Sequence, residues 1–236
     1  MIPGPALQVI CPHCHGEKAL SSLMSGNTFN AVNWSDTKTV CPMLLRNSPV
    51  QRCPHCGKFY FLSKARYRHP QDGTESMDTG ELTFEQAVEA LKQLYPMADS
   101  KQKFTLRLMV LYSFNDIIRY EEKPHLNDSQ IAAFIENCRE MIAMKETSQT
   151  LRAELYREIG EFEKCCEVLS EAEPCSLYES TVRSQILQWA RERDARVRAL
   201  PRFQGGDDEE TDIQEQQAKG LFEKIANFIS NLFIGE

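Results

Sequence analysis

Two copies of the tetrapeptide Cys-Pro-His-Cys, at residues 11–14 and 53–56, are the part of this chain best suited to chemistry. Each copy places two thiols two residues apart, so that both can reach one point from a single tight turn. Four such thiols can bind a metal ion, exchange electrons through disulfides, or pack as small apolar groups. Because a repeated CxxC pair is typical of tetrahedral metal sites, the spacing favours metal binding.

The expected metal is Zn²⁺ in a structural role. Four thiolates fill the tetrahedral shell of zinc and leave no open position for a reactive water. A module of about 70 residues buries little apolar surface, so the metal would supply folding energy that its core lacks. Gly57, directly after the second pair, suits the left-handed residue that closes such a turn.

The two cysteine turns resemble the CPxC and CPxCG turns of the zinc ribbon family, and the resemblance extends over about residues 8–68. The stretch MSGNTFNAVNWSDTKTVCPMLL is in addition similar to uncharacterised bacterial zinc-ribbon proteins. The resemblance implies four metal ligands, which are Cys11, Cys14, Cys53 and Cys56.

The interval between the two pairs, residues 15–52, is longer than the common spacing of about 15 to 20 residues. An inserted hairpin with strands around TFNAVNW and KTV would accommodate this length. Cys41 lies inside the interval and is expected to pack as a small apolar residue. His15 is the other residue that could replace a cysteine ligand.

A thiol oxidoreductase is an alternative interpretation of the same motifs. CPHC is also the active-site sequence of strongly oxidising thioredoxin-like proteins, and ALQVI before the first copy resembles the strand that precedes it there. The segment EKALSSLM after this copy could begin the corresponding helix. A thioredoxin fold, however, requires a βαβ frame around each motif, which the interval between the two copies is too short to provide.

Charge is unevenly distributed, which predicts separate modules. The first 70 residues contain eight Lys or Arg against two acidic residues, a formal charge of +6, whereas the rest of the chain carries −13 and the total is −7. We expect an α+β protein, a small β-rich zinc ribbon followed by an all-α, tetratricopeptide-like bundle. The expected segments are a ribbon over 1–70, a linker over 71–81, the helical bundle over 82–203, an acidic flexible linker over 204–220 and an amphipathic helix over 221–236.

Basic and aromatic residues alternate after the second cysteine pair, a mixture that can attract phosphate and stack on bases. The possible nucleic-acid contacts are Lys58, Lys64, Arg66 and Arg68, among Phe59, Tyr60, Phe61 and Tyr67. The ordinary interpretation makes the aromatic residues the core of a small domain and the cations its solvated surface. Nucleic-acid binding is therefore the first alternative function.

Residues 155–172 resemble one tetratricopeptide unit. The matching positions are Tyr156, Gly160, Phe162, Cys165 and Ala172, whereas Arg152 stands where that family places a leucine. Because about three repeats are needed for an independent solenoid, this resemblance implies a single helical hairpin within a bundle. Thr83 and Gln86 are suited to a capping box at the first helix of the bundle.

The end of the chain has apolar residues at helical spacing. They are Leu221, Phe222, Ile225, Phe228, Ile229 and Leu232. Membrane-surface helices usually carry several basic residues on the polar face, and here only Lys224 is basic. We therefore expect this helix to bind the bundle or a protein partner rather than a membrane.

The opening MIPGPALQVI lacks the basic and apolar regions of a signal peptide, and no run approaches the roughly 18 to 20 apolar residues of a membrane span. A cytoplasmic protein is expected. Motifs of the GxGxxG, P-loop, HExxH and GxSxG types do not occur. The sequence thus predicts a zinc-binding interaction or adaptor protein with an unidentified protein partner, and favours a role other than catalysis without deciding whether the chain is an enzyme.

Overall fold

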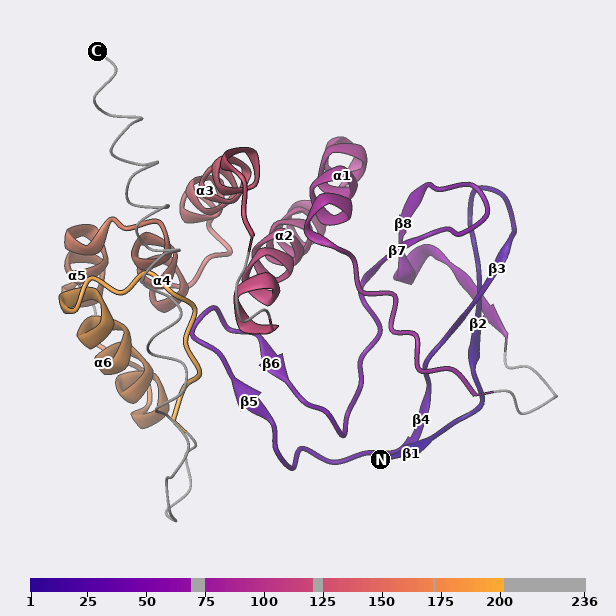
Figure 1. Cartoon of the computed structure of the whole chain (residues 1–236), viewed down its shortest axis with the longest axis horizontal. Coiled ribbons are helices and arrows are strands. Elements are labelled where there is room, and N and C mark those ends of the chain that lie inside the picture. Colours follow the sequence, from indigo (N-terminus) through magenta and orange to yellow (C-terminus); the bar gives the residue numbers. More distant parts are fainter. Residues whose placement is uncertain (69–74, 121–124, 172, 202–236) are drawn as a thin grey trace. The chain divides into compact units, whose positions relative to one another are not determined.

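The computed structural model describes residues 1–68, 75–120, 125–171 and 173–201 (Figure 1). Short strands occupy the first part of these residues and six α-helices follow, which confirms the expected α+β class. Contacts divide the chain into an N-terminal unit, residues 1–32 with 39–113, and a helical unit, residues 33–38 with the described residues from 114 on. No described helix is both long enough and apolar enough to cross a membrane. The five segment boundaries expected from the sequence stay predictions.

The strands of the N-terminal unit pair in antiparallel fashion into small sheets (Figure 1). The largest sheet has the order β3-β2-β9, and three further pairs are β1-β4, β5-β6 and β7-β8. The strands are β1 (Ile2–Pro3), β2 (Leu7–Ile10), β3 (Glu17–Leu20), β4 (Leu23–Ser25), β5 (Val32–Asn33), β6 (Thr39–Val40), β7 (Val50–Arg52), β8 (Phe59–Phe61) and β9 (Arg66–Arg68). The hairpin expected around SDTK is the β5-β6 pair.

The segment after the first CPHC is extended, so the possible helix over EKALSSLM is wrong. β3 pairs with β2 along its whole length, with Leu7 opposite Leu20. Leu20 and Val9 are fully buried in a core that also contains Tyr60. Burial of these apolar side chains on one face of a sheet outweighs the modest helical preference of the segment.

The aromatic run of β8 forms the core of the N-terminal unit, which confirms the ordinary interpretation of these rings. Phe59, Tyr60 and Phe61 are at most 6% exposed. Phe59 and Phe61 pack with Ala90 and Leu94 of helix α1 (Phe84–Leu94). This helix begins at the expected capping box, in which the side chains of Thr83 and Gln86 each bond the other's backbone amide.

The remaining helices are α2 (Ser100–Tyr120), α3 (Asp128–Ile142), α4 (Gln149–Glu158), α5 (Phe162–Ser170) and α6 (Leu177–Arg191). Side-chain oxygens of Asn127, Ser148 and Ser176 accept hydrogen bonds from backbone amides in the first turns of α3, α4 and α6, respectively. Helix α6 ends at Arg191. Arg193 has a φ of 55°, a left-handed conformation that ends the helix.

The helical unit is held by two sets of buried apolar contacts. Phe114 of α2 stacks on Phe134 of α3 with ring centroids 3.9 Å apart. A second cluster joins α4, α5 and α6 through Phe162, Cys165 and Ile186. Cys138 and Cys165 are fully buried among the apolar residues of the core.

Candidate metal centre

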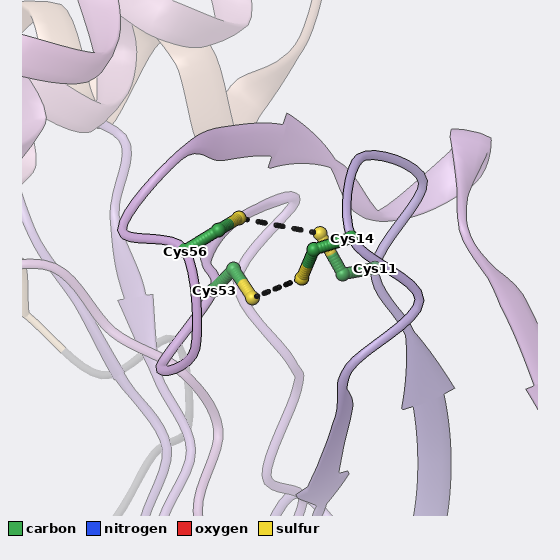
Figure 2. A group of neighbouring side chains, drawn as sticks. All are labelled: Cys11, Cys14, Cys53 and Cys56. Carbon is green, nitrogen blue, oxygen red and sulfur yellow. Dashed lines mark hydrogen bonds between the residues drawn. The ribbon is translucent and has the colours of Figure 1, made fainter.

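The first CPHC motif forms the tip of the β2-β3 hairpin. The amide of Cys11 donates to the carbonyl oxygen of Gly16 (2.9 Å), and the amide of His15 donates to the carbonyl oxygen of Cys11 (3.0 Å). These two bonds close a tight turn that projects Cys11 and Cys14 to the same side (Figure 2).

The second CPHC motif repeats this turn at the tip of the β7-β8 hairpin. The amide of Cys53 donates to the carbonyl oxygen of Lys58, and the amide of Gly57 donates to that of Cys53, both at 3.0 Å. Gly57 has a φ of 72° and His15, at the equivalent place in the first turn, has a φ of 60°. The left-handed residue expected at Gly57 is therefore present, and His15 adopts the same conformation with a side chain.

The two turns face each other and bring all four thiols together (Figure 2). Every pair of the Sγ atoms of Cys11, Cys14, Cys53 and Cys56 lies within 4.8 Å. Between the two turns, the Sγ atoms are 3.9 Å apart for Cys11 and Cys56 and 3.6 Å apart for Cys14 and Cys53. A tetrahedral metal with metal–sulfur bonds of about 2.3 Å requires sulfurs about 3.8 Å apart. The spacing thus fits a single tetrahedral ion, and exceeds the roughly 2.05 Å of a disulfide.

Backbone amides also point at these sulfurs. The amide nitrogen of His13 lies 3.4 Å from the Sγ of Cys11. Burial raises the pKa of Cys53. Hydrogen bonds from the amides of Cys56 and His55 and from the neighbouring thiols have the larger, opposite effect, so the pKa falls to about 7. An amide of Gly16 lowers the pKa of Cys14, yet burial and the three other thiols raise it to about 12. Four thiols packed this closely can all ionise only around a cation.

The two motif histidines link the turns to each other. The Nε2 atom of His13 lies 3.3 Å from the carbonyl oxygen of Phe59, and that of His55 lies 2.9 Å from the carbonyl oxygen of Glu17. Each ring, with Nε2–H as the donor, bonds the residue three positions after the last cysteine of the opposite turn. A Cβ atom on Gly16 would lie 2.3 Å from the ring of His55, so this glycine makes room for the contact.

Sequence reasoning did not predict this reciprocal arrangement. The available indication was the histidine at the same place in both tetrapeptides, His13 and His55. Neither ring is a metal ligand in the structure. Each one instead holds the cysteine turns in register, as hydrogen bonds around metal ligands commonly do.

Cys41 and His15, the two other candidates, lie outside the thiol cluster. Among the described residues the metal-binding group consists of four cysteines. The thiol of Cys41 donates to the carbonyl oxygen of Asn27 at 3.4 Å. The structure therefore gives the centre four sulfur donors of one chemical type, a set suited to a thiophilic metal ion.

The possible nucleic-acid contacts are surface residues. Lys58, Lys64 and Arg66 are exposed, and Arg68 forms an ion pair with Glu17 at 2.5 Å. Three of the four aromatic rings expected among them are buried, so only Tyr67, which is 53% exposed, is available for stacking on a base.

The apolar residues of the expected C-terminal helix, Leu221, Phe222, Ile225, Phe228, Ile229 and Leu232, lie outside the described residues.

Comparisons of the chain with protein-family models, with curated proteins and with solved structures found no match. The interpretation of the centre accordingly depends on its own geometry and donor chemistry. Those features show four cysteines arranged to hold a metal ion.

Proposed function

We propose that this chain is a zinc-binding protein with a zinc ribbon-like N-terminal unit, in which Zn²⁺ is structural. The observation that carries the proposal is the gathering of four thiols within 4.8 Å of one another from two separate turns. Four thiolates complete the shell of a tetrahedral ion, so the bound metal would stabilise the fold and activate no water.

Zinc is the metal that this donor set favours. A tetrahedral site of four sulfurs suits Zn²⁺ or iron, and poorly suits metals that prefer oxygen ligands. Zinc has no redox chemistry and commonly forms structural sites with four cysteines. Metal analysis of the purified chain tests this choice, since we expect about one zinc per chain and no colour, whereas iron would give a coloured protein.

A redox role is less well supported by the arrangement of the motifs. Each CPHC lies between two antiparallel strands, so a strand and not a helix directly follows each copy. A redox-active CxxC pair normally begins a helix, whose N-terminal amides stabilise the reactive thiolate. Sulfur contacts of 3.9 and 3.6 Å also join the two motifs to each other.

We further propose that the helical unit binds a protein partner. Helices α4 and α5 meet at Gly160, whose φ of 80° makes the tight turn expected of a tetratricopeptide-like hairpin. Beside α5 and α6 lies a groove of about 400 Å³. Its lining combines the apolar Leu169, Pro174 and Leu187 with polar and charged residues, which are Ser170, Glu171, Glu173, Ser180, Arg183 and Ser184. The exposed Leu177, at the start of α6, adds apolar surface with 74% of its area accessible.

The adaptor role is tested by photo-cross-linking of the full chain in cells and comparison of two matched variants. Leu177→Glu places a charge on the proposed partner surface. Met97→Glu places the same charge at an equally exposed apolar residue of the N-terminal unit, since Met97 is 71% exposed. We expect a specific cross-linked partner that is lost with Leu177→Glu and kept with Met97→Glu. Equal loss, or no partner for the unmodified chain, would contradict the proposal.

Nucleic-acid binding stays the alternative role for the basic residues of the N-terminal unit. It predicts that the full chain binds single strands with an affinity that falls steeply with salt. The double variant Lys64→Gln with Arg66→Gln should then weaken binding. Absence of any salt-dependent binding would dismiss this alternative.

A further inference from the structure

Residues 33–38, which are the last residue of β5 and the loop that leads to β6, are part of the helical unit although they lie in the interval between the two cysteine motifs. We call these six residues the strap. Ser35 is 3% exposed and Asp36 is fully buried, which is unusual for a polar loop of a hairpin. Such burial is tolerated only where the polar groups find partners.

The backbone of the strap pairs with the segment after α6. The amide of Ser35 donates to the carbonyl oxygen of Arg198 (2.8 Å), and the amide of Leu200 donates to that of Asn33 (2.7 Å). The amide of Arg198 also donates to the hydroxyl oxygen of Ser35 (2.9 Å). Trp34 and Ala199 form an antiparallel bridge between these bonds. The strap is therefore held as a short added strand.

Asp36 is the main charged contact of the strap. Its carboxylate accepts a hydrogen bond from the side-chain amide of Asn115 at 2.9 Å and forms an ion pair with Arg119. The side chains of Asp36 and Arg119 both have no accessible surface. The guanidinium of Arg119 also lies 4.9 Å from the ring centroid of Trp34. Trp34 and Asp36 of the strap thus both contact the buried guanidinium of Arg119.

The helical unit is incomplete without these contacts. Arg157 is fully buried and reaches the hydroxyl of Ser35 at 3.4 Å, and Lys38 forms an ion pair with Asp116 at 2.6 Å. Withdrawal of the strap would remove the carboxylate of Asp36 from Arg119 and leave Arg119 with Asp116, at 2.6 Å, as its ion-pair partner. Loss of one of two buried partners is destabilising, so water would have to enter this region.

The strap is connected to a cysteine pair of the metal centre on each side, to Cys11 and Cys14 before it and to Cys53 and Cys56 after it. The strap lies within residues 15–52, the interval that the cluster closes by bringing Cys14 and Cys53 together. Strands β5 and β6 contain two residues each, too few to fix the loop alone. Closure of the interval at the metal limits the conformations of its arms and raises the effective concentration of the strap.

We propose that the metal centre controls the docking of the strap, so that metal loss releases residues 33–38 from the helical unit. This inference rests on the proposed metal binding. Release exposes the charged groups that Asp36 and Ser35 cover in the metal-bound chain. The unusual length of the interval between the motifs then has a function, because it carries the segment that couples the two units.

Hydrogen exchange of the full chain tests the coupling. The amides of Arg198 and Leu200 report on the strap, because their acceptors are the Ser35 hydroxyl and the Asn33 carbonyl. Amides of α5 serve as the internal reference. We expect removal of the metal by a chelator, under reducing conditions, to raise exchange at Arg198 and Leu200 at least about tenfold and to change α5 less than about twofold.

A variant of the strap separates docking from metal binding. Asp36→Asn should raise exchange at Arg198 and Leu200 while the metal content stays at about one per chain, because residue 36 is remote in sequence from the ligands. Chelation of this variant should add little further exchange at these amides. Asp128→Asn, at an exposed aspartate of α3, is the matched control and should leave them unchanged.

Two results would overturn the inference. One is metal loss with unchanged exchange at Arg198 and Leu200, and the other is an equal rise in α5, which would mean general unfolding. A purified chain without metal would refute the proposed metal binding itself, and the inference with it. Metal analysis before the exchange experiment distinguishes this failure from the other two.

Discussion

The two polar centres of this protein, a partly exposed cysteine cluster and a buried charge cluster, are held together in different ways. The cysteine cluster gathers four donors of one kind, whereas the charge cluster of the helical unit gathers groups of both signs. The charge cluster consists of Asp36, Asn115, Arg119, Glu154, Arg157 and Glu158, all nearly inaccessible to solvent. Like donors require an external cation to hold them together, while opposite charges satisfy one another within the chain. Spacing therefore reveals the first centre in the sequence but not the second.

The centres also differ in what they contribute to stability. Binding of a structural zinc contributes about 10 to 16 kcal/mol in small zinc-dependent peptides, enough to decide whether a small unit folds. A complete buried ion pair is often nearly neutral compared with apolar packing, yet removal of one partner costs about 3 to 5 kcal/mol. We therefore expect removal of a metal ligand to have the larger effect, and removal of one buried charge the second largest.

The largest effect is expected for Cys53→Ser. Loss of one thiolate from a closed four-sulfur site should weaken metal affinity more than about 100-fold, beyond the 10- to 100-fold typical of changes around the ligands. Competition with a chelator of known affinity measures this loss. Cys41→Ser is the matched control, because Cys41 lies in the same unit but outside the cluster, and should keep full affinity. Equal effects of both substitutions would contradict the assignment of ligands.

Arg157→Met tests the charge cluster. Arg157 and Glu154 form a bidentate pair, with N–O distances of 2.8 and 2.5 Å, and both side chains are inaccessible to solvent. The substitution leaves a buried carboxylate without its cation and should lower the free energy of unfolding by about 3 to 5 kcal/mol. Urea unfolding of the metal-bound chain measures the change.

Lys164→Met is the control for that substitution. Lys164 and Glu161 have the same sequence separation as the buried pair, but their side chains are 58% and 23% exposed. An exposed pair of this kind contributes less than about 1 kcal/mol. Similar losses for Arg157→Met and Lys164→Met would refute the distinction between buried and exposed pairs.

The raised pKa of the buried Glu158 should make the stability of the fold depend on pH. Burial raises its pKa well above the ordinary value, with Glu154 and Asp36 adding to the rise and Arg157 and Asn115 opposing it. Above the unfolded pKa of about 4.5 the unfolded chain releases a proton that the folded chain keeps, so stability falls as pH rises toward the folded pKa. Glu158→Gln should remove this fall, up to about 1.4 kcal/mol per pH unit, and be the more stable form at pH 8.

Glu179 provides a control of opposite sign. Hydrogen bonds from the thiol and amide of Cys175 and from Thr150 lower its pKa to about 2. Its contribution is present above the unfolded pKa and is lost as pH falls toward the folded value. Glu179→Gln should therefore lower stability at neutral pH. Unfolding at pH 3, pH 5 and pH 8 compares the two variants, because the contribution of Glu179 changes only below its unfolded pKa of 4.5. Parallel pH profiles for Glu158→Gln and the unmodified chain would contradict the burial argument.

The smallest effects are expected at the two left-handed positions of the cysteine turns. A Cβ on Gly57 would meet only Arg52, at 4.0 Å, so Gly57→Ala measures backbone strain with little steric clash and should cost about 1 kcal/mol. His15→Gly relieves the same strain and should be neutral or stabilising by less than about 1 kcal/mol. Thermal unfolding of the metal-bound chain measures both changes. A lower unfolding temperature for His15→Gly would contradict the equivalence of the two turns.

The sequence was sufficient to predict the elements whose causes are local. The spacing of Cys11, Cys14, Cys53 and Cys56 requires only that two tight turns meet, and the structure brings the four thiols together. The capping box at Thr83 is likewise a relation between residues three positions apart. Such features depend on neighbouring residues, so their patterns are visible in the chain.

Features that depend on distant partners were not predictable in the same way. The strand after the first motif forms because Leu20 pairs opposite Leu7 and is buried with Tyr60. Asp36 appeared only as one of two acidic residues in a basic segment, and its partner Arg119 is 83 residues away. Nothing in the composition of the strap indicates that helices must cover it.

X-ray absorption spectroscopy at the metal edge, on the full chain as purified, tests the central claim most directly. The account predicts about one zinc per chain with four sulfur neighbours at about 2.3 Å and no nitrogen neighbour. A shell containing a histidine nitrogen would contradict the assignment of His13 and His55 as links between the turns. A metal-free chain in which Cys11 and Cys14 form a reversible disulfide would contradict the account as a whole.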